Sequence, residues 1–195
     1  MASSGSVRRM DHSPLLLALF ERRTEDAATL LAERGDDLDA LEAAATGRVE
    51  VLERHLEADR AGVLAARTPE GFDAIGLAAF LGGPDAVGVL LRHGADPEGD
   101  PENELGVRPV HAAAAARDAE AMLLLLSAGA DPDSPQRGGI VPLHAAAMHD
   151  DVETVRVLLD HGADPARRAD DGRDALAFAT EGGAAGTLPL LRSAL

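Results

Sequence analysis

Seven histidines and the adjacent aspartates at residues 150–151 and 170–171 are among the side chains of this sequence that could bind a metal or transfer protons. A zinc site needs three or four ligands that converge on the ion. The histidines form no HxH or HExxH pattern, and the chain contains no cysteine. The carboxylates of Asp150-Asp151 and Asp170-Asp171 diverge in a helix or a strand, which favours solvated charge over a paired acid–base site. We therefore expect no metal, no cofactor and no catalytic residue.

Sequence signatures of nucleotide binding and of nucleophilic catalysis are also absent. The chain contains no GxSxG nucleophile elbow, no Walker loop and no GxGxxG fingerprint. The segment GGPDAVG at residues 82–88 is rich in glycine, but its position predicts a turn that leads into a helix. These observations favour a protein that is not an enzyme.

The charge and the apolar runs of the chain limit its partners and its location. The 195 residues carry a formal net charge of −16, and all 18 basic residues are arginine. Such an acidic surface repels phosphate backbones and anionic lipids, so we expect neither a nucleic-acid partner nor a membrane partner. The apolar run at residues 15–20 is too short for a signal peptide, and no segment approaches the roughly 18 apolar residues of a membrane helix. We expect a cytoplasmic protein.

Two sequence landmarks recur with one period. The tetrapeptide GADP begins at residues 94, 129 and 162, so its copies are 35 and 33 residues apart. An upstream glycine stands at residues 71, 106, 139 and 172, at intervals of 35, 33 and 33 residues. A fixed period of this length indicates an array of stacked units, each of which buries its apolar face against its neighbours.

Each unit is predicted to be a pair of helices that ends in a turn. In the unit that begins near Gly139, Pro142 suits the first position of a helix because its missing N–H is not needed there. After the acidic pair 150–151, apolar residues at helical spacing predict a second helix. This helix stops at Gly162, since glycine adopts the left-handed conformation of a helix end at little cost. GADP is therefore interpreted as a repeated stop signal and not as an active site.

The motifs VPLHAA at residues 141–146 and RPVHAA at residues 108–113 resemble the T-P-L-H-x-A entry of the ankyrin repeat family. The resemblance is clear over about residues 68–195, and residues 12–67 look like degenerate units. It implies an all-α solenoid of helix-turn-helix pairs with β-turn or hairpin loops and about six repeats, the terminal ones degenerate. We expect a flexible segment at residues 1–11 and a single domain at residues 12–195. The expected repeats span residues 12–37, 38–67, 68–100, 103–135, 136–168 and 169–195.

The entry threonine of the family is absent from every unit of the clear region. Asp73 and Asp174 replace it and can cap the helices that follow. Arg108 and Val141 cannot reproduce the hydroxyl, so we expect an altered hydrogen-bond network in the middle repeats. The histidines of the two entry motifs are expected to be structural hydrogen-bonding residues.

By the same resemblance, partners bind on a concave strip that the loop tips and the inner faces of the first helices form. Carried over position by position, the strip consists of Glu70, Phe72, Phe80, Leu81, Leu105, Val107, Arg137, Ile140, Met148, His149, Arg173 and Glu181. Apolar side chains at positions that the scaffold does not need to bury predict a site for a partner protein that is basic or offers an apolar anchor.

Three alternatives to this interpretation stay open. Long loops can fold over these side chains and cover them. A small-molecule or enzymatic pocket, which would need convergent polar groups, can form in the groove near Phe72, Phe80, Met148 and His149. The ends of the array can also associate with other copies of the chain, although we expect a monomer.

Overall fold

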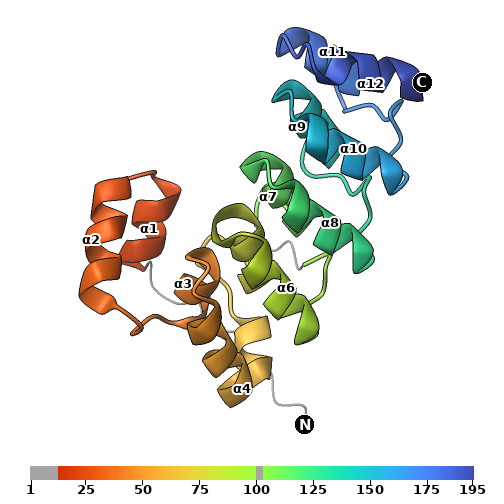
Figure 1. Cartoon of the computed structure of the whole chain (residues 1–195). Helices are drawn as coiled ribbons and strands as arrows, with labels where there is room; N and C mark the ends of the chain where they lie inside the picture. Colours follow the sequence, from red (N-terminus) through yellow and green to blue (C-terminus); the bar gives the residue numbers. More distant parts are fainter. Residues whose placement is uncertain (1–12, 100–102) are drawn as a thin grey trace.

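The computed structural model describes residues 13–99 and 103–195, and the regular secondary structure in these ranges is helical. The segment 1–11, which we expected to be flexible, and residues 100–102 lie outside the described residues. Figure 1 shows paired helices that follow one another in a curved row from the N-terminal to the C-terminal part of the chain.

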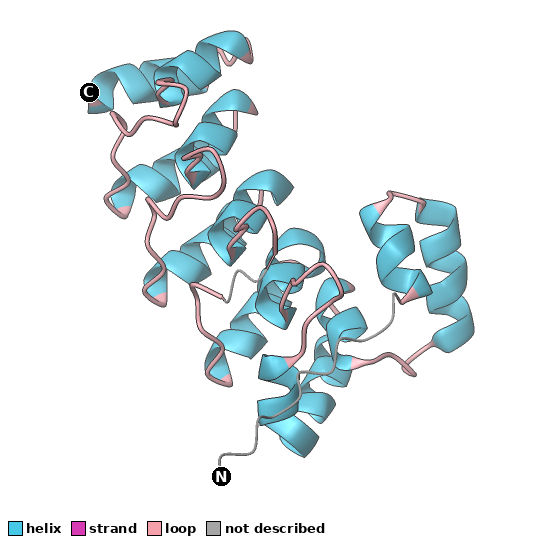
Figure 2. Ribbon diagram, turned by 180° about the vertical axis from the view of Figure 1, so that it is seen from behind, coloured by secondary structure: helices cyan, strands magenta, loops and turns pink. Residues whose placement is uncertain are grey.

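Six helix pairs make up this row and its N-terminal extension. They are α1 (Pro14–Phe20) with α2 (Thr24–Arg34), α3 (Ala40–Ala45) with α4 (Val49–Ala65), α5 (Ala74–Leu77) and its π-helical continuation η1 (Ala78–Gly82) with α6 (Pro84–Arg92), α7 (Pro109–Ala116) with α8 (Ala119–Ser127), α9 (Pro142–Met148) with α10 (Val152–Asp160), and α11 (Ala175–Glu181) with α12 (Thr187–Ala194). From α3 onward, first helices pack against first helices and second helices against second helices, in two layers visible in Figure 1 and Figure 2. The fold is the all-α solenoid that the period predicts.

Aspartate side chains begin several of these helices. Asp73, Asp118 and Asp174 precede α5, α8 and α11, and each accepts a hydrogen bond from the backbone amide three residues later at 2.8–3.0 Å. Asp73 and Asp174 therefore cap helices in place of the family's threonine, as the sequence indicated. Pro189 does not kink α12, because this helix begins at Thr187 and the proline ring lies in its first turn.

The three GADP copies end α6, α8 and α10. Gly94, Gly129 and Gly162 have φ angles of 86°, 105° and 89°, in the region that glycine adopts without a steric penalty. In the loops after Gly129 and Gly162, isolated antiparallel bridges join Gln136 to Ile140 and Arg168 to Asp174. The interpretation of GADP as a helix stop is confirmed.

The loops that follow GADP are also tied to one another by a repeating hydrogen bond. Glu98, four residues after its turn glycine, accepts a hydrogen bond from the backbone amide of Asp131 in the next loop. Asp133 holds the same position one period later and accepts from the amide of Asp164 at 3.1 Å. In the following loop the equivalent position is Ala166, which offers no acceptor side chain. We call the two carboxylate–amide contacts the loop rungs.

Small residues let neighbouring pairs approach closely at the turns between their helices. A Cβ atom on Gly82 would lie 1.9 Å from the carbonyl oxygen of Ala44 in the preceding pair. A Cβ atom on Gly182 would lie 2.2 Å from the carbonyl oxygen of Met148. Both positions therefore require glycine, because no side chain fits between the two backbones.

The N-terminal pair does not continue the row. α1 contacts α3, but α2 does not pack along α4 as the other second helices pack along their neighbours. Figure 1 shows this pair set to one side of the row. Its internal geometry is that of the other pairs, because Arg22, Arg117 and Asp150 occupy equivalent turn positions with φ of 56°, 58° and 53°. The pair is thus an ordinary repeat hairpin in a different orientation.

Candidate functional site

The residues of the predicted concave strip fall into two groups. The exposed members are Glu70, Leu105, Arg137, Met148, His149 and Glu181, and the half-buried members are Phe72, Phe80, Leu81, Val107, Ile140 and Arg173. They do not form one continuous open surface, because contacts within the chain occupy both ends of the strip.

At the N-terminal end, the strip is covered by the last residue of α1. The ring centroid of Phe20 lies 5.8 Å from that of Phe72 and 6.4 Å from that of Phe80. Such separations are those of interacting aromatic pairs. The first open alternative, that other parts of the chain cover the aromatic residues, thus describes this end, although a helix and not a loop provides the cover.

At the C-terminal end, the two charged residues of the strip bind each other. Arg173 donates hydrogen bonds to Glu181 at 2.5 Å and to Asp171 at 2.8 Å. Its guanidinium lies 4.2 Å from the ring centroid of Phe178, which in turn stacks on His144 at 4.8 Å. Sequence reasoning missed Phe178, whose only signal was its place among the apolar residues of a first helix.

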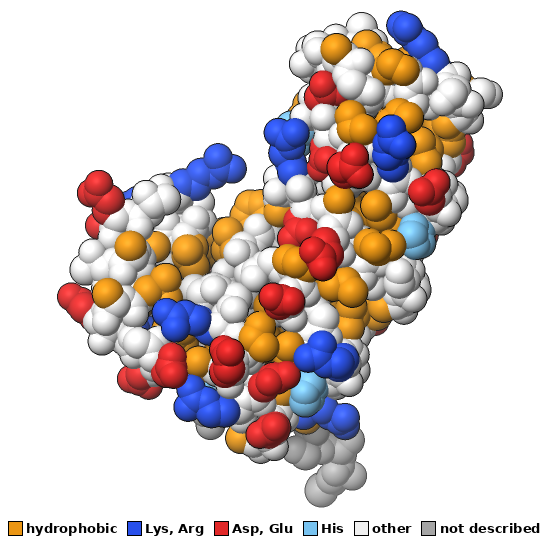
Figure 3. Space-filling model, in the orientation of Figure 1, with side chains coloured by type: hydrophobic (Ala, Val, Ile, Leu, Met, Phe, Trp, Pro, Cys, Tyr) orange, Lys and Arg blue, Asp and Glu red, His pale blue; other side chains and the backbone are white. Residues whose placement is uncertain are grey.

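The centre of the strip is open to solvent. Leu105 on a loop tip has an exposed fraction of 51%, and Met148 at the end of α9 has one of 42%. Ala115 and Ala116, on α7 between them in the chain, are exposed as well. The backbone amide of Arg137 donates to the carbonyl of Leu105 at 2.8 Å, so neighbouring loop tips hold each other in place. Figure 3 shows hydrophobic side chains around the hollow between the N-terminal pair and the upper part of the row.

His111 and His144 connect successive repeats. The Nδ1 atom of His111 accepts a hydrogen bond from the amide of Arg108, which leaves Nε2 to donate to the carbonyl of Ile140 at 3.2 Å. His144 binds the amide of Val141 and the carbonyl of Arg167 in the same manner. Burial lowers the pKa of both imidazoles, that of His111 to about 4. Both rings are therefore neutral structural links.

The adjacent aspartates Asp150 and Asp151 serve as helix caps. Asp150 accepts hydrogen bonds from the amides of Gly186 and Thr187 at 2.9 and 2.8 Å, so it caps α12 of the next repeat. These amide hydrogen bonds lower the pKa of the Asp150 carboxyl. Asp151 accepts from the amide of Thr154 and caps its own helix, α10. Within the described ranges no group of three His, Asp or Glu residues could hold a metal ion.

Glu42 is a buried junction that sequence reasoning missed. Its carboxylate is 1% exposed and accepts hydrogen bonds from Ser13 Oγ at 2.6 Å, from Arg34 at 2.5 Å and from the amide of Asp39 at 2.9 Å. The available signal was its register, since DALEAAA aligns with VPLHAAA and places Glu42 where His144 stands. The carboxylate fastens both ends of the α1–α2 pair to α3.

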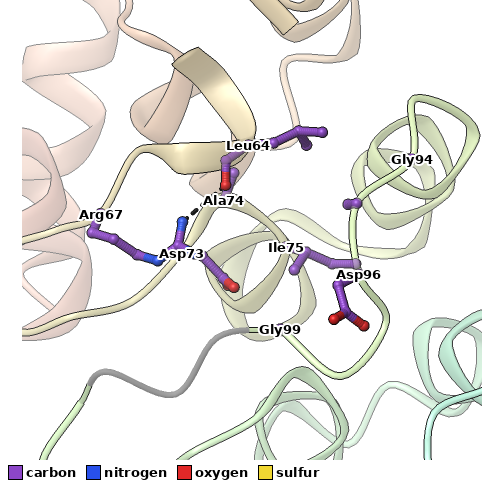
Figure 4. Close-up of a pocket in the computed structure, with 9 residues that line it drawn as sticks. Leu64, Arg67, Asp73, Ala74, Ile75, Gly94, Asp96 and Gly99 are labelled. Atoms are coloured by element: carbon purple, nitrogen blue, oxygen red, sulfur yellow. Dashed lines mark hydrogen bonds between the residues drawn. The ribbon is translucent and has the colours of Figure 1, made fainter. Parts of the chain in front are cut away.

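A cavity of about 240 Å³ lies between the end of α4 and the loop after α6 (Figure 4). Its charged residues already serve the fold. Arg67 donates to the carbonyls of Leu64 and Ala66, and Asp73 caps α5. None of the aromatic or methionine residues of the predicted groove lines this cavity. It therefore gives the small-molecule alternative no support.

Ordered helix pairs on a repeat of about 33 residues define a class of proteins, the helical repeat solenoids. Residues 110–194 match the family model described as ankyrin repeats (3 copies), which confirms the resemblance over this part of the chain. The match begins at Val110, and the pairs before it share the architecture of the row but not the matched sequence. No curated protein matches the chain. In the part of the chain that the structure describes, every helix is too short or too polar to cross a bilayer.

Proposed function

We propose that the protein is a non-enzymatic interaction module that binds a partner protein on its concave face. Ankyrin repeats are generally protein-interaction modules. The observation that carries the proposal is the exposure of Leu105 and Met148, two large apolar side chains on neighbouring repeats, in the centre of the strip. Exposed apolar surface that polar residues rim is typical of partner sites.

The proposed partner is a protein with an apolar anchor and basic flanks. The formal charge of −16 attracts basic proteins and speeds their encounter with the acidic chain. The same charge disfavours nucleic acids and anionic membranes. We also propose that this chain is cytoplasmic and monomeric. Its mass in light scattering should therefore stay constant as its concentration rises.

The test is a pair of matched charge substitutions. Leu105→Asp together with Met148→Asp should abolish recovery of the partner in an affinity purification from the source lysate, because a charge would enter the apolar centre. Leu123→Asp is the control, since Leu123 on α8 is 43% exposed but stands outside the strip. Far-UV circular dichroism confirms that each variant folds. Equal recovery by the double variant and the control would overturn the proposed site.

A further inference from the structure

The α1–α2 pair is attached to the row at its base. Ser13, just before α1, and Arg34, at the end of α2, both donate to the same Oε1 atom of Glu42. The pair is a hairpin whose turn lies at residues 21–23, so its base and its tip are opposite ends. Both chain ends of the hairpin are therefore held at one buried carboxylate, which is where an axis of rotation of the hairpin would lie.

Near its base, α1 buries Leu15 and Leu16 in the core that it shares with the row, whereas at the tip its contact with the strip is made by Phe20. Phe20 meets Phe72 and Phe80, and all three rings are only half-buried. Beside this contact, Leu17 and Glu70 line a narrow crevice of about 20 Å³ between α1 and the loop tip. The aromatic contact at the tip is thus only half-buried, unlike the contact that Leu15 and Leu16 make at the base.

The second helix of the first pair in the row, α4, has a polar outer face that the hairpin does not cover. Exposed charged residues stand on α4, and Arg48 and Arg54 lie 3.6 Å from the carboxylate of Asp36 in the linker. A polar outer face of this kind is typical of a terminal repeat, so the row ends at α4 on the side of its second helices. The linker residues Gly35, Asp36 and Asp37 are all exposed, and a Cβ atom on Gly35 would meet nothing within 4 Å.

We propose that α1 and α2 form a hinged cover over the N-terminal part of the concave strip. The cover turns about residues 35–37 as a folded unit, with Glu42 at its pivot, and uncovers Phe72 and Phe80. Turning exposes the one aromatic cluster of the strip, so the cover regulates how much apolar surface a partner meets. That consequence rests on the proposed function, whereas the opening itself does not.

The chain offers a specific probe for this motion, because it contains four phenylalanines and no cysteine. Three of the phenylalanines, Phe20, Phe72 and Phe80, form the covered cluster, and Phe178 at the far end of the row is 5% exposed and serves as an internal reference. The full chain is labelled with 4-fluorophenylalanine. A soluble nitroxide then reports the solvent access of each ring through the relaxation of its fluorine signal.

A cross-linked variant supplies the closed reference. Leu17→Cys with Glu70→Cys, joined by a short bismaleimide, fixes the hairpin on the loop tip. Compared with this closed form, the wild-type chain should show faster nitroxide relaxation of Phe72 and Phe80 and unchanged relaxation of Phe178. Amide exchange inside α1 and α2 should be the same in both forms, because the cover moves without unfolding.

Phe20→Ala should raise the ratio of open to closed molecules about tenfold, since it removes the ring contact at the tip. Leu123→Ala, which truncates an exposed apolar side chain on α8, should leave the ratio unchanged.

Two results would overturn the hinged cover. Equal relaxation of Phe72 and Phe80 in the wild-type and cross-linked chains would mean that the pair does not open. Slower amide exchange throughout α1 and α2 after cross-linking would mean that the pair unfolds instead of turning. Neither result depends on a partner. The variants at Leu105 and Met148 therefore test the proposed function independently of the hinged cover.

Discussion

Acid should lower the free energy of unfolding through His111, a buried residue with an exposed fraction of 5%. Desolvation is the largest cause of its shift, which lowers the pKa from 6.5 to about 4. Because the folded-state pKa is the lower one, this stability is fully present above pH 6.5 and is lost as the pH falls from 6.5 towards 4. At pH 5.5 the unfolded state is favoured by a further factor of about ten, which equals about 1.4 kcal/mol.

His111→Gln is the matched variant for this prediction. A glutamine at the third position of a helix can accept the same amide hydrogen bond, and it does not titrate. Urea unfolding at pH 7 and pH 5.5 is followed by far-UV circular dichroism, because the chain has no Trp or Tyr for fluorescence. Between the two pH values the wild type should lose about 1 kcal/mol more than the variant. Equal losses in the two proteins would refute the link between burial of His111 and acid sensitivity.

Three further substitutions test close packing and capping. Gly82→Ala should destabilise the protein by about 2 kcal/mol in thermal or urea unfolding, because its Cβ would overlap the carbonyl oxygen of Ala44. Gly88→Ala should stabilise the protein by about 0.8 kcal/mol, since a Cβ at this position of α6 has ordinary contacts at 3.6 and 3.9 Å. A destabilised variant would contradict these contact distances. Asp150→Asn should accelerate amide exchange in α12 but not in α10, and the difference from the wild type should vanish as the pH falls through the lowered pKa of Asp150. Exchange that rises equally in both helices would contradict an inter-repeat cap.

Much of the fold could be predicted from the sequence because its signals are local. The left-handed glycine of each GADP copy ends a helix whatever surrounds it, and Asp73 caps α5 through an amide three residues away. Pro142 begins α9 for an equally local reason. Repetition of such signals at one period establishes the row, since each unit has apolar residues that only a neighbour can bury.

The orientation of the N-terminal pair could not be predicted in this way. The turn at Arg22 has the backbone of the turns at Arg117 and Asp150, so the local sequence predicts one more member of the row. Its actual placement depends on contacts across long separations, those of Phe20 with the rings of the strip and of Ser13 with Glu42. The same limit explains why the strip was expected to be open at its N-terminal end.

The loop rungs allow whole repeats to be deleted or inserted without loss of the carboxylate–amide hydrogen bonds between neighbouring loops. In both rungs the carboxylate accepts from a backbone amide that every GADP turn presents at the same position, so Glu98 would find an identical amide donor in the loop of Asp164 if one whole period were deleted. Glu98 would then lose the additional hydrogen bond that it accepts from the Ser134 hydroxyl. A deletion or insertion of a few residues would instead carry the donor out of reach. Growth or shortening of the array by complete units therefore preserves the coupling between loops, and Ala166 marks the boundary at which the last unit goes without it.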